Sequence, residues 1–86
     1  MNELEIYRKK IDALDDTLLD VLFERQSIVK KVGEYKHAHN LPVADAARKA
    51  AVMKKFKTAP GLDGKFGEEL YELIHKYAVK SEEEIK

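Results

Sequence analysis

Two positively charged side chains lie on the apolar face of a long N-terminal segment. Arg25 falls between Leu22 and Ile28, and Lys36 follows Val32 by four residues on the same side. A charge on an apolar helix face is costly unless it is paired or meets a ligand of opposite sign. Either position alone is explained by a salt bridge or by a side chain that extends to solvent. Together they indicate a binding site for an anion.

Two further arginines support this interpretation. Arg8 lies beside Tyr7 near the start of the segment, and Arg48 falls in the first turn of the next predicted helix. An arginine in a first turn opposes the helix dipole, so its side chain often points at an anionic group instead. Four such cations predict a site for a small molecule with two negative charges.

Helix geometry then restricts how these cations can meet. Arg25 and Lys36 are 11 residues apart, which is roughly 16 Å of rise on nearly the same face. Arg8 is 28 residues from Lys36, or roughly 42 Å along one helix. It cannot reach the same ligand within one chain. An antiparallel dimer of long helices would bring the partner's copy of this arginine to the site, so we expect a site shared between two chains.

The apolar spacing predicts an all-α fold in a single domain, 1–86, without strands. Apolar residues recur at three- and four-residue steps in helices expected at about 2–38, 46–58 and 64–84. Asn2, Asp45 and Asp63 are placed to cap them, and prolines mark both breaks. The first helix would be roughly 50 Å long. That exceeds the diameter of so small a domain, so the helix must pack along a partner.

Composition excludes several classes of function. Lys plus Arg and Asp plus Glu both number 16, there is no cysteine, and no stretch is apolar enough to span a membrane. We therefore expect no nucleic-acid partner, no membrane partner and a cytoplasmic location. His37 and His39, an H-x-H pair where the first helix meets the first break, and His75 in the third helix are not at metal-binding spacing, so no metal site is predicted.

The motifs along the chain resemble the all-helical, AroQ-class chorismate mutases. The pattern R-x-x-I-D-x-L-D begins at Arg8, E-R follows at Arg25, and V-G-x-x-K ends at Lys36. The stretch 42–48 resembles the loop and second-helix start of that family, and 70–82 resembles its last helix. The resemblance implies a three-helix protomer whose long first helices pair in an intertwined homodimer. It also implies an isomerase that converts chorismate to prephenate in phenylalanine and tyrosine biosynthesis.

The resemblance assigns catalytic roles to Arg25, Lys36 and Glu82. Arg25 matches the arginine that binds a substrate carboxylate, Lys36 the lysine bound to the ether oxygen, and Arg8 the arginine from the partner chain. Glu82 falls where many members have a glutamine that donates to the ether oxygen. A carboxyl group can donate there only when protonated, so we expect activity to rise towards mildly acidic pH.

The remaining site residues implied are Asp45, Arg48, Lys49 and Ala78. Asp45 and Arg48 match positions around the ring hydroxyl and the entrance to the second helix. Lys49 stands where the family usually has a glutamate that helps to bind this hydroxyl, and Ala78 replaces a small polar residue of some relatives. The change at Lys49 leaves three alternatives open: weaker binding, a different chorismate-like ligand, or a degenerate site.

The rearrangement is pericyclic, so it requires no nucleophile, metal or cofactor, and we expect none. The protein must hold both carboxylates so that the enolpyruvyl arm folds over the ring, and must stabilise charge on the ether oxygen. Two alternatives remain: an isochorismate-pyruvate lyase on the same scaffold, and a non-catalytic regulatory dimer. The regulatory alternative includes association with the first enzyme of aromatic biosynthesis, or a place within a larger fusion protein.

Overall fold

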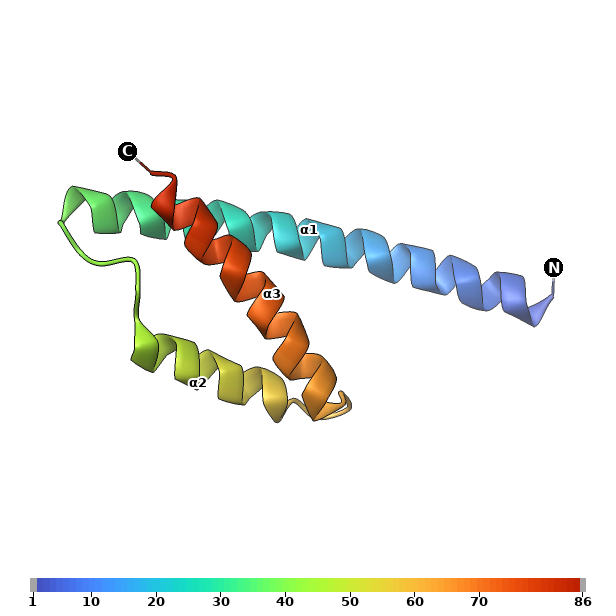
Figure 1. Ribbon diagram of the computed structural model, residues 1–86. Coiled ribbons are helices and arrows are strands. Elements are labelled where there is room, and N and C mark those ends of the chain that lie inside the picture. Colours follow the sequence, from blue (N-terminus) through green and yellow to red (C-terminus); the bar gives the residue numbers. More distant parts are fainter. Residues whose placement is uncertain (1, 86) are drawn as a thin grey trace.

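The computed structural model describes residues 2–85, which form three helices and, within that range, no strand (Figure 1). Helix α1 spans Glu3–Ala38, α2 spans Ala46–Lys57 and α3 spans Gly64–Glu83. The predicted all-helical class with one long N-terminal helix is confirmed. Helices α2 and α3 each end one residue before the predicted limit, because Thr58 and Glu84 act as C-caps.

Each helix begins at a side-chain cap that the sequence predicts. The Asn2 side chain accepts a hydrogen bond from the Glu5 backbone N–H at 2.9 Å. Asp45 accepts one from the Arg48 N–H at 3.0 Å, and Asp63 accepts two from the first turn of α3. These caps satisfy backbone donors that have no partner within the helix. Both breaks between helices are therefore set by local sequence.

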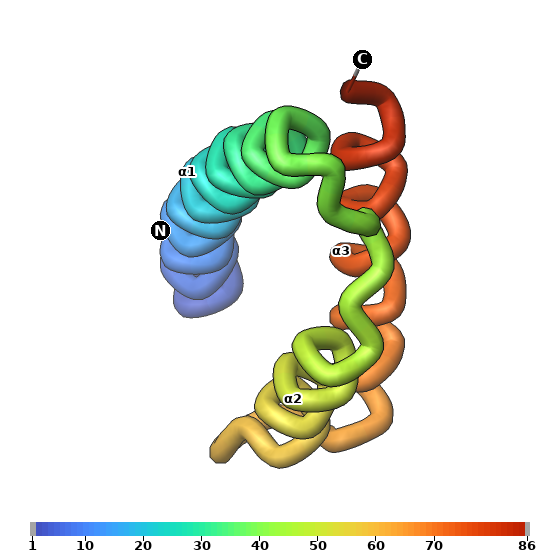
Figure 2. Tube along the Cα trace, turned by 90° about the vertical axis from the view of Figure 1, so that its left-hand side faces the viewer, coloured from blue at the N-terminus to red at the C-terminus, as the bar shows by residue number. Residues whose placement is uncertain are grey.

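Helix α3 is the bridge between the other two helices. It crosses the C-terminal half of α1 and packs along α2, while the N-terminal half of α1 projects beyond both (Figures 1 and 2). Among the described residues, α1 and α2 make no direct backbone contact. The protomer is accordingly elongated, with extents of 57 × 25 × 14 Å. The space between α1 and α2, closed on one side by α3, is where a site can form.

Two glycines let α3 approach its neighbours closely. A Cβ atom at Gly67 would collide with the carbonyl group of Phe56 in α2. A Cβ atom at Gly33 in α1 would lie 3.0 Å from the Cα atom of Glu82 in α3. The missing side chain of Gly33 therefore brings the end of α3 onto α1, one turn from Lys36.

A single protomer has a very small apolar core. Among the described residues, the buried apolar side chains are Tyr71, 3% exposed, and Ala78, 7% exposed. Large apolar residues on α1 remain exposed at alternating four- and three-residue steps, with Arg25 in the position between Val21 and Ile28. These exposed residues are Tyr7, Ile11, Leu14, Leu18, Val21, Ile28, Val32 and Tyr35. The described helices include none with enough continuous apolar length to span a bilayer. The exposed α1 residues form an unpartnered coiled-coil-like stripe, called the α1 seam below.

Candidate active site

A cavity of about 250 Å³ lies between the three helices, in the space that α3 closes. Its lining contains seven of the eight predicted site residues: Arg25 and Lys36 from α1, Asp45, Arg48 and Lys49 from the start of α2, and Ala78 and Glu82 from α3. Most of the other lining residues are apolar, mainly valines. Arg8 is not among the lining residues and is exposed near the opposite end of α1.

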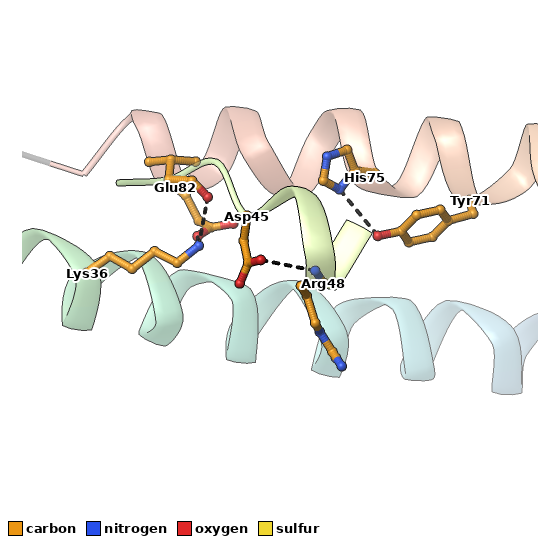
Figure 3. A network of polar contacts seen from close by, with 7 residues as sticks. Lys36, Asp45, Arg48, Tyr71, His75 and Glu82 are labelled. Atoms are coloured by element: carbon orange, nitrogen blue, oxygen red, sulfur yellow. Dashed lines mark hydrogen bonds and ion pairs between the residues drawn. The ribbon is translucent and has the colours of Figure 1, made fainter. Parts of the chain in front are cut away.

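Lys36 and Glu82 form an ion pair at one end of the cavity (Figure 3). Lys36 Nζ lies 2.7 Å from Glu82 Oε1, and the side chains are 19% and 10% exposed. Lys36 Nζ also donates a hydrogen bond to the backbone oxygen of Val43 at 2.8 Å. The loop carbonyl and the carboxylate thus hold the ammonium group in place, which is the preorganisation that a catalytic donor requires.

One oxygen of Glu82 has unused hydrogen-bonding capacity. Oε1 is buried and, among the described residues, accepts no hydrogen bond of good geometry. The 2.7 Å approach of Lys36 Nζ is therefore an electrostatic contact without hydrogen-bond angles. A buried polar atom without a hydrogen bond is costly. This end of the cavity is therefore suited to a polar group of a ligand.

Arg48 and Asp45 lie at the start of α2, on the opposite wall from Lys36. The Asp45 side chain caps the helix through the Arg48 backbone N–H, while the Arg48 side chain extends from the first turn (Figure 3). Neither Arg25 nor Arg48 belongs to an ion pair within the described part of the chain. Two unpaired guanidinium groups on facing walls can each bind a carboxylate through paired hydrogen bonds.

The cavity also contains two residues that sequence reasoning did not assign to it. Tyr71 and His75 of α3 line its far end, and Tyr71 Oη lies 3.4 Å from His75 Nδ1 (Figure 3). His75 precedes Glu82 by seven residues and follows Tyr71 by four. All three therefore share one face of α3. Helical spacing from Glu82 would have found His75, which the sequence analysis considered only as a metal ligand.

The charges of the site act on His75. Burial lowers the pKa of His75 below its usual value of 6.5, and the positive charges of Lys49, Arg25 and Lys36 lower it further. Glu82 opposes them. The imidazole is therefore held in its neutral form at neutral pH.

This pKa shift predicts a pH dependence of stability. The folded state binds the His75 proton less tightly than the unfolded state. The contribution of the neutral His75 side chain to the free energy of unfolding is therefore fully present above pH 6.5, and it is lost as pH falls through the folded-state pKa. We expect the free energy of unfolding to fall more steeply between pH 7.5 and 5 in the parent protein than in His75→Gln. Denaturant titrations at one fixed chain concentration measure this difference, and parallel curves would contradict it.

The comparison with protein families agrees with this geometry. The family model of chorismate mutase type II matches residues 7–83. The chain belongs to this family. The predicted family is thereby confirmed, and so is the predicted class of enzyme, an isomerase of the chorismate mutase type. The matched residues include every side chain of the cavity described above.

Individual chorismate mutase type II relatives differ in length and in name. The chain is 34% identical over 76 residues to the 4-amino-4-deoxychorismate mutase of Streptomyces venezuelae, covering 85% of this chain and 74% of that protein. It is 32% identical over 84 residues to the protein of that name in Streptomyces pristinaespiralis, covering 94% and 65%. It is 33% identical over 85 residues to the bifunctional chorismate mutase/prephenate dehydratase of Escherichia coli, covering 95% and 22%.

Proposed function

We propose that this protein converts chorismate to prephenate in the cavity between its three helices. The observation that carries the proposal is the convergence of Arg25, Arg48 and the Lys36–Glu82 pair on one cavity, in a chain of the chorismate mutase type II family. The two guanidinium groups face a space large enough for a compact dianion. The buried ammonium group supplies a charged donor at one end of it.

The proposed mechanism divides the work between binding and electrostatics. Arg25 and Arg48 hold the two carboxylates so that the enolpyruvyl arm lies over the ring, which converts binding free energy into a reactive conformation. The bond between the ring carbon and the ether oxygen then breaks as the new carbon–carbon bond forms. Lys36 donates to the ether oxygen, where negative charge grows in the transition state.

Glu82 has a different role in each protonation state. As a carboxylate it pairs with Lys36, as in the structure, and would repel the charge that grows on the ether oxygen. When protonated, it can donate a second hydrogen bond to that oxygen. The side-chain amide in Glu82→Gln can donate to the ether oxygen without being protonated, so we expect kcat for prephenate formation at pH 7.5 to rise in this variant. An unchanged or lower kcat would contradict the role.

The α1 seam and the position of Arg8 support a homodimer. The seam runs the whole length of α1, and a second copy of the same helix would match its repeat. Beside it, a mostly apolar cavity of about 210 Å³ is lined by Leu22, Leu73, Ile74 and Tyr77, together with Arg25 and Gln26. In an antiparallel pair of α1 helices, the N-terminal half of the partner's α1 would cover this region. It would also bring the partner's Arg8 to the part of the site that binds the substrate carboxylates.

Product identification tests the proposed reaction. Purified protein is incubated with chorismate, and prephenate is expected. In a parallel incubation with isochorismate, the formation of salicylate and pyruvate would favour the lyase. No turnover of either compound by an intact dimer would favour the regulatory module. Association with the first enzyme of aromatic biosynthesis and a cytoplasmic location stay predictions.

A further inference from the structure

Lys49 and His75 form one wall of the candidate active site. Both residues line the 250 Å³ cavity, and both also line a neighbouring cavity of about 310 Å³. Asp45 lines the same two cavities. These side chains, from the start of α2 and from the middle of α3, therefore stand between the two spaces. A ligand in the active-site cavity can therefore contact them.

The charges facing this wall come from all three helices. Arg25 and Lys36 project from α1, Lys49 from α2, and Glu82 from α3. The Glu82 carboxylate is already paired with Lys36, and Asp45 Oδ1 is occupied by the first turn of α2. Among the residues that line the active-site cavity, four side chains are positively charged and two are carboxylates, so a new cation would add to an excess of positive charge. Burial lowers the pKa of His75, and the positive charges of Lys49, Arg25 and Lys36 lower it further, in keeping with this excess.

We propose that Lys49 and His75 are specificity-determining residues that select a substrate with a neutral hydroxyl group on its ring and reject one with a ring ammonium group. The inference rests on the proposed function and names its substrate class. Relatives of this chain act, by their names, on 4-amino-4-deoxychorismate. An aliphatic amine is protonated at neutral pH. Its charge would be repelled by the Lys49 ammonium, whereas a hydroxyl oxygen accepts a hydrogen bond from it.

His75 adds a neutral partner to this selection. Its Nδ1 atom lies 3.4 Å from Tyr71 Oη, so in the proposed complex Nε2 is the ring nitrogen that meets the ligand. A neutral imidazole exchanges a hydrogen bond with a hydroxyl group without adding charge to the wall. In that complex Arg25 and Arg48 bind the carboxylates, which leaves Lys49, His75 and the helix-capping Asp45 on this wall to meet the ring substituent.

The test compares two compounds that differ only in this substituent. Dissociation constants from calorimetry and kcat/KM values are measured for chorismate and 4-amino-4-deoxychorismate at pH 7.5. The parent protein is expected to prefer chorismate by at least tenfold in binding. In Lys49→Glu we expect this preference to shrink by at least tenfold. The preference of Lys49→Gln should lie between those of the parent and Lys49→Glu. A glutamate in the first turn of α2 suits the helix dipole, so folding is retained.

Lys54→Glu is the matched control, because it makes the same charge change on an exposed residue of α2 that lines none of these cavities. Lys54→Glu should leave the ratio of the dissociation constants for the two compounds unchanged. His75→Leu is expected to weaken chorismate binding more than binding of the amino compound. Equal affinity of the parent for both compounds, binding of neither, or an equal response in Lys54→Glu would overturn the inference. A binding preference without turnover of either compound would uphold it and overturn the proposed function instead.

Discussion

Replacing Lys36 by alanine is expected to lower kcat for prephenate formation by about 10²- to 10³-fold, the usual effect of removing one preorganised donor to a developing oxyanion. The structure gives the reason. Two protein oxygens, at 2.7 and 2.8 Å, hold Lys36 Nζ in a mostly buried position. Because the Lys36 ammonium group is mostly buried, a mobile lysine on the surface could not replace it as the donor. KM should change much less than kcat, because the ether oxygen gains most of its charge in the transition state.

The control for this experiment must separate chemistry from folding. Lys36→Ala leaves the Glu82 carboxylate buried without its cation, which is itself destabilising. The double variant Lys36→Gln/Glu82→Gln removes both charges and keeps the side-chain volume, so it should fold like the parent and still lack activity. Lys31→Ala, on the exposed side of α1, serves as the matched single change. A double variant that retains parental kcat would exclude Lys36 from the reaction.

Mixing two inactive variants is expected to restore activity if Arg8 comes from the partner chain. Arg8→Ala and Lys36→Ala homodimers each have two defective sites. When equal amounts are unfolded and refolded together, half of the dimers contain one chain of each kind. In these heterodimers both substitutions fall in one site and the other site is intact. Random pairing therefore predicts about a quarter of the parental activity.

A second mixture shows whether the recovery has the proposed cause. Arg25 and Lys36 line the cavity of the same protomer. Mixing Arg25→Ala with Lys36→Ala therefore places one defect in each site of every heterodimer, and no activity should return. If the mixture with Arg8→Ala also stays inactive while heterodimers form, the partner's arginine does not complete the site.

The features that could be predicted from the sequence are those set within a few residues. The three caps and both breaks depend on local hydrogen bonds, and the structure has them where the sequence places them. The cavity was also predictable in outline. Arg25 and Lys36 share a face of α1 by helical spacing alone, and the family resemblance added Glu82 and Arg48, which meet them in the cavity.

The features that were missed depend on how helices rotate against one another. Gly67 allows α3 to pack closely against α2, and Tyr71 and His75 lie on the face of α3 that lines the cavity. The second anchor of Lys36, a backbone oxygen of the first break, has no side-chain signature in the sequence. The role of Arg8 depends on a second chain, so neither the sequence nor one protomer tests it.

The near absence of a core in one protomer has a consequence for the behaviour of the proposed dimer. With only Tyr71 and Ala78 as buried apolar side chains among those described, most of the favourable apolar burial in such a dimer would come from association. Folding, pairing and site assembly would then be a single equilibrium that depends on chain concentration. A dianion bound between Arg25 of one chain and the arginine of the other would belong to the same equilibrium. In the proposed dimer, substrate would therefore act as a cross-link, and a cell rich in chorismate would keep more of a scarce protein assembled than one depleted of it.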